Sequence, residues 1–217
     1  MATKSRKYQN QKILRTLLIA LIVLAVIGVG VTLLQNAGKK NDGIKDSANL
    51  TGTHYVAIDV AGHGTITAEL YADAAPITVE NFMHLVDEKF YDGLTFHRII
   101  DGFMVQGGCP LGNGTGGADQ DIKGEFAANG VDNPLKHVRG VISMARSALP
   151  DSASSQFFIM HQDAPHLDGN YAAFGKVLSG MEIVDALCAN TPVQDGNGTV
   201  LKADQPVITS IRRIEKP

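Results

Sequence analysis

The stretch FHRIIDGFMVQGG, residues 96–108, places an arginine between two apolar runs and ends in a glutamine and two glycines. Side chains of a β-strand alternate between two faces, so Phe96, Arg98 and Ile100 are expected to share one face. An arginine on a strand is commonly a solvated, outward-facing residue. The alternative is a guanidinium held at the floor of an apolar groove.

The neighbours of Arg98 favour the groove. Phe103 and Met104 supply adaptable apolar surface, and Gln106 can brace the guanidinium through its amide oxygen. An apolar pocket beside a fixed set of N–H donors suits a small apolar ring attached to an amide. Proline is such a ligand, so this stretch predicts a proline-binding groove.

The segments around this stretch indicate the fold class. Residues 54–60 and 65–70 alternate in hydrophobicity around an AGHG turn, which predicts a β-hairpin. An amphipathic helix is expected after Pro76, because apolar residues recur there with helical spacing. Further strands are expected at 95–100, 103–107, 140–145, 155–160, 172–178 and 206–214, with Pro206 as the first residue of the last, and a second helix at 180–188. Many short strands with two helices predict a mainly β protein, an antiparallel barrel or sandwich.

The N-terminal part of the chain predicts a membrane anchor. Residues 17–34 carry no charge and are long enough to span a bilayer as a helix. Five basic residues precede this run, which favours a cytoplasmic N-terminus. We therefore expect a cytoplasmic basic segment at 1–12, a transmembrane signal-anchor helix at 13–36, a flexible linker at 37–52 and a folded extracytoplasmic domain at 53–217. A cleaved signal peptide is the alternative.

Charge and cysteine content exclude several functions. From residue 53 onward there are 11 Lys and Arg against 20 Asp and Glu, which leaves that part at −9. Such a balance argues against nucleic acid as a partner. Cys109 and Cys188 are too few for a disulfide framework or a Cys-rich zinc site. His161 and His166 have a spacing that does not suit a shared metal ion, so we expect no metal and no cofactor.

Five segments together resemble one family. FHRIIDGFMVQGG, GNGTGG, SMARS, SSQFFIM and HLDGNYAAFGKV, in this order and at these separations, are similar to cyclophilin-type peptidyl-prolyl isomerases. The resemblance runs from about residue 54 to 215. It implies a closed eight-stranded antiparallel β-barrel capped by two α-helices, with an active groove on the outside.

The resemblance also implies roles for individual residues. Arg98 matches the catalytic arginine, and Phe103 and Gln106 accompany it in the catalytic set. The expected substrate-binding residues are Met104, Ala145, Arg146, Gln156, Phe158, His166, Leu167 and Tyr171. Among these, Phe103, Met104, Phe158 and Leu167 correspond to the proline pocket, and Ala145 with Arg146 to the segment that holds the peptide backbone.

Three positions depart from the family pattern. His166 stands where many members carry the tryptophan that the family associates with tight cyclosporin binding, so we expect weaker drug affinity with catalysis largely kept. Tyr171 replaces a histidine and still offers an O–H donor and an aromatic wall. Arg146 replaces an asparagine, which either matters little or favours acidic substrates.

The sequence as a whole thus predicts a membrane-anchored, monomeric prolyl isomerase that acts outside the cytoplasm on proline-containing unfolded or extended polypeptides. A tethered peptide-binding or chaperone module without catalysis is the main alternative, and it would need the pocket but not the guanidinium. A structural cell-envelope protein has only the anchor in its favour.

Overall fold

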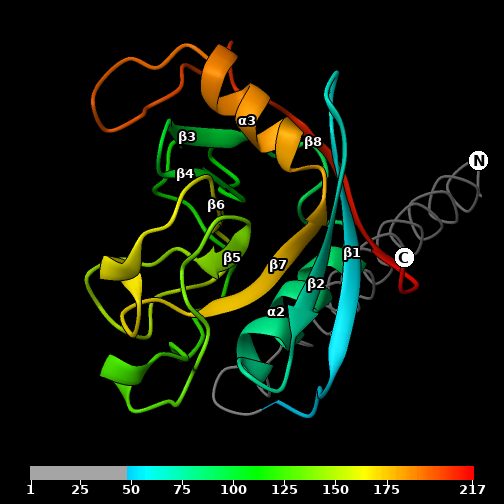
Figure 1. Ribbon diagram of the computed structural model, residues 1–217, viewed down its shortest axis with the longest axis vertical. Helices are drawn as coiled ribbons and strands as arrows, with labels where there is room; N and C mark the ends of the chain where they lie inside the picture. Colours follow the sequence, from blue (N-terminus) through cyan, green and yellow to red (C-terminus); the bar gives the residue numbers. More distant parts are fainter. Residues whose placement is uncertain (1–47) are drawn as a thin grey trace, which may run out of the picture. The chain divides into compact units, whose positions relative to one another are not determined.

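In the computed structural model, which describes residues 48–217, the domain begins with the predicted hairpin. Strands β1 (Thr53–Val60) and β2 (Gly64–Tyr71) pair antiparallel along their whole length (Figure 1, cyan). Their alternating apolar residues, such as Val56 and Ile58, are fully buried. One face of the hairpin therefore faces the core, as the period of two predicts.

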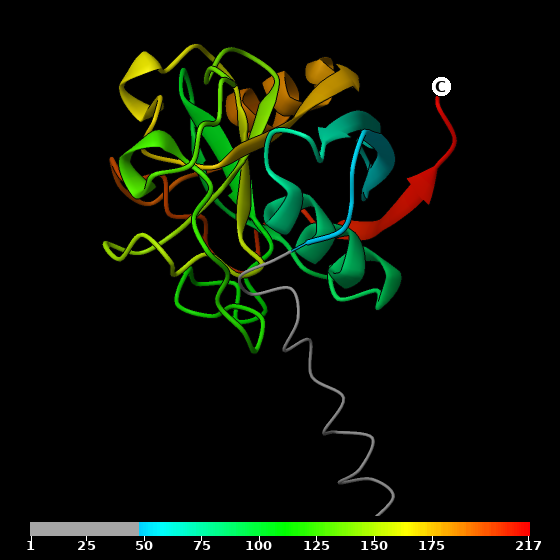
Figure 2. The same ribbon diagram turned by 90° about the horizontal axis from the view of Figure 1, so that it is seen from below.

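Helix α2 (Pro76–Asp87) follows, with its proline at the start as predicted. The expected apolar stripe is buried and faces the sheet, and it comprises Val79, Phe82, Met83 and Val86. The helix packs against β2 and the last strand, β8 (Ile208–Ile214), and the turned view shows α2 beside β8 (Figure 2). A remote carboxylate satisfies its first turn: Glu125 accepts hydrogen bonds from the backbone N–H groups of Ile77 and Thr78, at 3.0 and 2.8 Å.

Eight antiparallel strands form one sheet in the order β3-β4-β6-β5-β7-β2-β1-β8. The strands between the hairpin and β8 are β3 (Phe96–Ile100), β4 (Met104–Gly107), β5 (Val141–Met144), β6 (Phe157–Met160) and β7 (Ala173–Ser179). Two short 3₁₀ helices, η1 (Ala127–Asn129) and η2 (Pro165–Leu167), lie in the loops. The predicted strands are confirmed to within about two residues, although β8 starts at Ile208 and not at Pro206.

The prediction of a closed barrel is wrong, because the sheet is a curled half-barrel whose edge strands β3 and β8 form no ladder with each other. The segments just before them do meet, at a bridge between Thr95 and Val207 and through the hydrogen bonds Phe96 N–H to Pro206 (3.0 Å) and Ile208 N–H to Leu94 (2.7 Å). The outer edge of β3 is instead occupied by the loop before β8. There Ile99 donates its N–H to the Gly198 carbonyl (2.8 Å), and Arg98 bridges Thr199. This loop satisfies backbone N–H and C=O groups of β3 that β8 would have paired with in a closed barrel.

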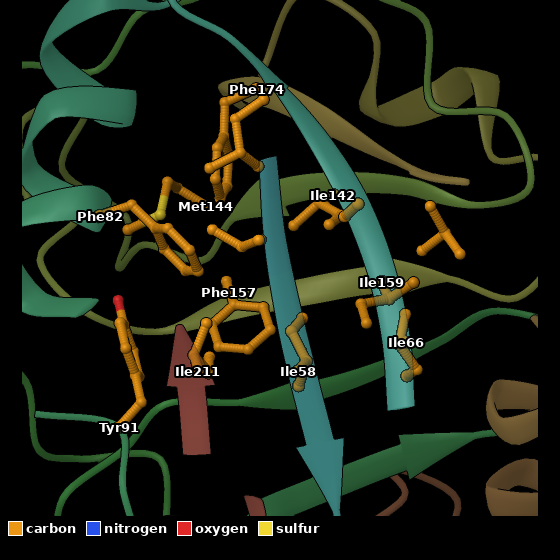
Figure 3. Packing of buried hydrophobic residues seen from close by; sticks show 14 of the residues in the cluster. Ile58, Ile66, Phe82, Tyr91, Ile142, Met144, Phe157, Ile159, Phe174 and Ile211 are labelled. Atoms are coloured by element: carbon orange, nitrogen blue, oxygen red, sulfur yellow. The ribbon is translucent and has the colours of Figure 1, made fainter. Parts of the chain in front are cut away.

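The core lies inside the curl of the sheet (Figure 3). Aromatic rings gather at its centre: Phe82 lies 5.0 Å from Tyr91 and 5.5 Å from Phe157, and Phe174 lies 5.2 Å from Phe82. Edge-to-face and tilted pairs of this kind add to the free energy gained from burial. The interior is therefore filled by side chains, and any binding surface has to lie on the outside.

The second helix, α3 (Met181–Asn190), packs against β2, β3 and β4. Figure 1 shows α2 and α3 at opposite ends of the curled sheet, as the family resemblance implied. Both cysteines, Cys109 and Cys188, are buried free thiols.

The predicted basic segment, the predicted anchor and most of the predicted linker lie outside the described residues. Within residues 48–217, no helix is both long enough and apolar enough to cross a bilayer. The last residues of the predicted linker contact the domain. Asn49 and Leu50 donate their backbone N–H groups to Glu80 at 2.7 and 3.1 Å, and Gly52 donates to Asp73 at 2.8 Å.

Candidate active site

The register of four strands brings the central site residues into one row. Arg98 on β3 lies opposite Gln106 on β4, Gln106 lies opposite Phe158 on β6, and Phe158 lies opposite Ser143 on β5. Residues at matching positions of paired strands project from the same face. The outer face of the sheet therefore carries arginine, glutamine and phenylalanine side by side.

One part of the predicted alternation on β3 is wrong. The register shifts between Phe96 and Arg98, so His97 is an additional residue opposite β4. A bulge of this kind reverses the alternation on one side of it. Phe96 consequently joins Ile99 in the core, while Arg98 faces the groove.

The paired glycines that end the opening stretch are explained by close packing. A Cβ at Gly107 would lie 2.9 Å from the ring of Phe96. Gly108 has φ of 82°, and a Cβ there would lie 2.6 Å from the Ser155 carbonyl oxygen. Larger residues would force β4 away from its neighbours and disturb the row of site residues.

Arg98 is half-buried and held by two acceptors. Its Nε donates to the backbone carbonyl of Asn197 (2.8 Å), and its Nη1 donates to Oε1 of Gln106 (3.2 Å). Burial lowers the pKa of Arg98, although an arginine in a protein stays protonated. The sequence therefore correctly pairs Arg98 with Gln106, whereas the Asn197 carbonyl was missed because a backbone acceptor has no signature in side-chain patterns.

A chain of amides fixes Gln106. Its oxygen accepts from Arg98, so its Nε2 is free to donate to Oε1 of Gln156 at 2.9 Å. Gln156 in turn donates to the carbonyl oxygens of Gly114 and Gly116, at 2.9 and 2.6 Å. Each amide has one orientation that satisfies this chain, so the guanidinium is held in place from one side of the groove.

The apolar side of the groove contains the four predicted pocket residues, Phe103, Met104, Phe158 and Leu167. Together with Arg98, Gln106, Ala145, Arg146 and Tyr171 they line a cavity of about 210 Å³. Nine of the eleven predicted site residues thus meet in one cavity. None of these nine is a carboxylate, a histidine or a cysteine, so the groove offers none of the usual ligands of divalent metal ions.

The other two predicted residues lie at the margins. Gln156 lines an adjoining cavity together with Gln106, Ala145 and Arg146. His166 is exposed on η2, and its ring stacks on Phe103 with 5.8 Å between centroids. His166 thus covers one side of the pocket from outside.

His137 supports the pocket from behind, and sequence reasoning did not select it. Its ring stacks on Phe158 with 6.1 Å between centroids. Nδ1 lies 3.1 Å from the Asp168 carboxylate and Nε2 lies 3.0 Å from the Ser143 hydroxyl. This resembles a serine–histidine–aspartate arrangement, but Ser143 is fully buried, so its hydroxyl cannot reach a substrate. Burial lowers the pKa of His137. The neutral ring packs behind Phe158 and holds it in position.

Arg146 is held against the domain. Its guanidinium lies 4.6 Å from the ring centroid of Tyr171 and 5.0 Å from that of Phe126. It donates to the carbonyls of Asn170 (3.0 and 2.8 Å) and Ser147 (2.9 Å). Three of its five N–H groups and both ring faces are engaged within the domain, so Arg146 fixes the Tyr171 wall of the groove. This geometry favours the interpretation without selection for acidic substrates.

Comparisons with known proteins identify the family. The family described as cyclophilin type peptidyl-prolyl cis-trans isomerase/CLD matches residues 55–213. Peptidyl-prolyl cis-trans isomerase B of Bacillus subtilis is 49% identical over 137 residues, covering 63% of this chain and 87% of the relative. A peptidyl-prolyl cis-trans isomerase of Helicobacter pylori is 50% identical over 130 residues, covering 60% of this chain and 76% of the relative.

Solved structures give the same result. A cyclophilin type peptidyl-prolyl cis-trans isomerase of Cryptosporidium parvum superposes with a TM-score of 0.67 at 31% identity, covering 76% of this chain and 100% of that one. The same protein was also crystallised in the presence of the dipeptide Ala-Pro, and that structure covers 75% of this chain and 99% of its own with a TM-score of 0.66 at 32% identity. The chain belongs to the cyclophilin-type peptidyl-prolyl cis-trans isomerase family, and peptidyl-prolyl cis-trans isomerase is its enzymatic class.

Proposed function

We propose that Arg98 drives the isomerisation by donating a hydrogen bond to the prolyl nitrogen of a twisted X–Pro bond in an unfolded or extended polypeptide. The observation that carries this proposal is the position of the guanidinium. It is braced by Gln106 and the Asn197 carbonyl at the floor of a groove whose other side is apolar.

The chemistry of the peptide bond explains why a donor suffices. Rotation about an amide C–N bond crosses about 18–20 kcal/mol, because the nitrogen lone pair is conjugated with the carbonyl. In the twisted state this conjugation is lost, and the pyramidal nitrogen becomes able to accept a hydrogen bond. A donor aimed at that nitrogen stabilises the twisted state more than either planar isomer, and this difference is what accelerates the reaction.

The required energy is modest for a preorganised site. Stabilising the twisted state by ~7 kcal/mol beyond the ground state gives roughly a 10⁵-fold acceleration. The guanidinium contributes as a charged donor in a partly desolvated groove, where electrostatic interactions are stronger than in water. The proline ring, seated among Phe103, Met104, Phe158 and Leu167, stays fixed while the preceding carbonyl rotates.

The experiment compares wild type with Arg98→Ala and Arg98→Lys, using NMR exchange rates on a peptide that contains Ala-Pro. We expect Arg98→Ala to lower kcat/KM by roughly 10²–10³-fold, as removal of a transition-state donor does. Arg98→Lys should recover only part of the loss, because lysine keeps the charge but not the fixed fork.

Arg213→Ala is the matched control, since Arg213 lies on β8 and pairs with Asp87 at 2.6 Å, away from the groove. It should keep the wild-type exchange rate. An Arg98→Ala variant as active as wild type would rule out the arginine mechanism. A wild-type protein that binds the peptide without any acceleration would instead identify a peptide-binding module.

We further propose that the isomerase domain is held outside the cytoplasm by residues 13–36, where it assists the folding of exported polypeptides. The uncharged run at 17–34 and the basic residues before it support this proposal. The test is external protease applied to intact, wall-stripped cells, followed by detection of the C-terminal domain. Digestion in intact cells is expected, whereas survival until lysis would place the domain inside.

A further inference from the structure

Three metal-ligating side chains converge away from the groove, where the turn after β3, the end of β6 and helix α3 meet. They are Asp101, His161 and Cys188, and one ligand atom from each lies within 4.8 Å of the others. We propose that these three residues bind a divalent transition-metal ion, with Zn²⁺ the best match. This site is separate from the residues that line the proline groove.

The tautomer of His161 puts the ring lone pair on Nδ1, the nitrogen that faces Asp101. Nδ1 accepts a hydrogen bond from the Gly102 N–H (2.9 Å), so the ring proton is on Nε2, which lies 3.1 Å from Oδ1 of Asp185. Zinc-bound histidines commonly donate their second ring N–H to a carboxylate, and the Asp185 carboxylate lies next to Nε2 here although the pair is not aligned as a hydrogen bond. Asp185 is itself held by Arg139 at 2.7 Å. A carboxylate able to orient the His161 ring is therefore adjacent to it.

The separation of the first two ligands suits a small ion. Nδ1 of His161 lies 3.4 Å from Oδ1 of Asp101. Two ligands about 2.0–2.2 Å from a tetrahedral zinc ion lie roughly 3.3–3.5 Å apart. On binding, the ion replaces the Gly102 N–H at Nδ1. The turn at Gly102 therefore has to move, and ligand atoms that lie within 4.8 Å of one another have to close around the ion. The exposed Asp101 gives the ion a route of entry.

Charge and donor type point to the class of ion. Cys188 is a buried free thiol that lies close to the carboxylate of Asp101. As the metal–sulfur bond forms, the thiol proton leaves to solvent. Two carboxylates and one thiolate then face Arg139 and a divalent cation, so the formal charges balance. A sulfur and an imidazole nitrogen are ligands that Zn²⁺ accepts and that Ca²⁺ and Mg²⁺ avoid.

The first experiment uses Co²⁺ as a spectroscopic probe on the full-length, tag-free chain after treatment with a chelator. We expect a near-ultraviolet sulfur-to-cobalt charge-transfer band that Zn²⁺ abolishes by displacing the cobalt. Cys188→Ser should remove this band. Cys109→Ser is the matched control, because Cys109 is also a buried free thiol but lies elsewhere, and it should keep the band. A missing band, or a band that survives in Cys188→Ser, overturns the proposal.

The second experiment measures Zn²⁺ affinity and thermal unfolding, which do not depend on isomerase activity. The ligands come from three elements, so binding should join α3 to the sheet and raise the Tm of the wild type. Asp101 is exposed, so Asp101→Asn should fold normally while losing at least about tenfold in Zn²⁺ affinity. Asp92→Asn, at another exposed turn, is the control. Equal affinities in Asp101→Asn and wild type would exclude the site.

Discussion

Phe157 and Phe158 are neighbours on β6, yet they belong to different parts of the molecule. Phe157 points into the curl of the sheet, where Phe82 and Tyr91 lie 5.5 and 5.7 Å away (Figure 3). Phe158 points outward into the groove, between His137 at 6.1 Å and Tyr171 at 6.0 Å. The pleat of one short strand thus separates the core from the groove.

The two faces differ in what surrounds their rings. Interior rings pack against other apolar side chains, and each is supported by several neighbours. Groove rings are supported from behind by a polar set, His137 with its partners Asp168 and Ser143, and they leave one side open for a ligand. The interior is therefore arranged for stability, and the groove is arranged to keep an apolar surface rigid while it is exposed to water.

The largest effect is expected from Phe157→Ala. The ring is fully buried among aromatic neighbours, so its removal leaves a cavity and should lower the free energy of unfolding by about 3–5 kcal/mol. Urea unfolding gives this quantity. The folded fraction should keep most of its wild-type kcat/KM, and a selective loss of activity with normal stability would contradict the division between the two faces.

Acidification should give the next largest effect, through His97. Burial first, and then the charge of Arg98, lower the pKa of His97 from 6.5 to about 4. Its ring is 5% exposed, and neither nitrogen has a well-aligned hydrogen-bond partner within residues 48–217. Between these two pKa values the unfolded chain binds the proton and the folded chain does not. Stability is therefore full above pH 6.5 and falls by about 3 kcal/mol towards pH 4.

Urea unfolding at several pH values measures this loss, with His97→Gln as the comparison. Because glutamine does not titrate, the variant should show a shallower dependence on pH in this window. Parallel curves for the two proteins would mean that His97 is not the responsible group.

Phe158→Ala should reverse the pattern of Phe157→Ala. Part of its ring faces the open groove, so we expect a smaller loss of stability, about 1–2 kcal/mol. The proline ring loses one wall of its pocket, so kcat/KM should fall at least tenfold, mainly through KM. NMR exchange rates on an Ala-Pro peptide together with urea unfolding give both values, and a loss of stability as large as that of Phe157→Ala would break the comparison.

Arg146→Ala should have a smaller effect on the groove. Without the guanidinium between Phe126 and Tyr171, the Tyr171 wall loses its support. We expect kcat/KM to fall about fivefold, which corresponds to about 1 kcal/mol of transition-state stabilisation. The loss should be equal for peptides with acidic and with neutral residues before proline. A selective loss with acidic peptides would instead assign Arg146 to substrate charge recognition.

An effect of similar size, but on drug binding and not on catalysis, is expected from His166→Trp. The family resemblance associates tryptophan at this position with tight cyclosporin binding, and His166 already stacks on Phe103. A larger aromatic surface should strengthen cyclosporin binding by roughly 1 kcal/mol, about fivefold, with little change in catalysis. Titration of both proteins with cyclosporin tests this, and equal affinities would remove His166 as the determinant.

Much of the fold follows from local patterns in the sequence. Side-chain periodicity predicts the hairpin, the apolar stripe of α2 and the alternation of apolar residues along the strands. The structure confirms all three. The position of Phe96 could not be obtained this way, because the bulge at His97 depends on how β3 pairs with β4. Likewise the half-barrel opens because the loop at Gly198–Val200 pairs with β3, a contact about a hundred residues apart in the chain.

The candidate site divides in the same way. The sequence by itself determined which side chains line the groove, from Arg98 and Gln106 to Phe158 and Tyr171, because their chemistry and order are written in the chain. Only the tertiary structure decided what holds them: the Asn197 carbonyl on Arg98, His137 behind Phe158, and Phe126 beneath Arg146. A supporting contact depends on register, curvature and loop path, which arise when distant segments pack, whereas side-chain chemistry is already present in the unfolded chain.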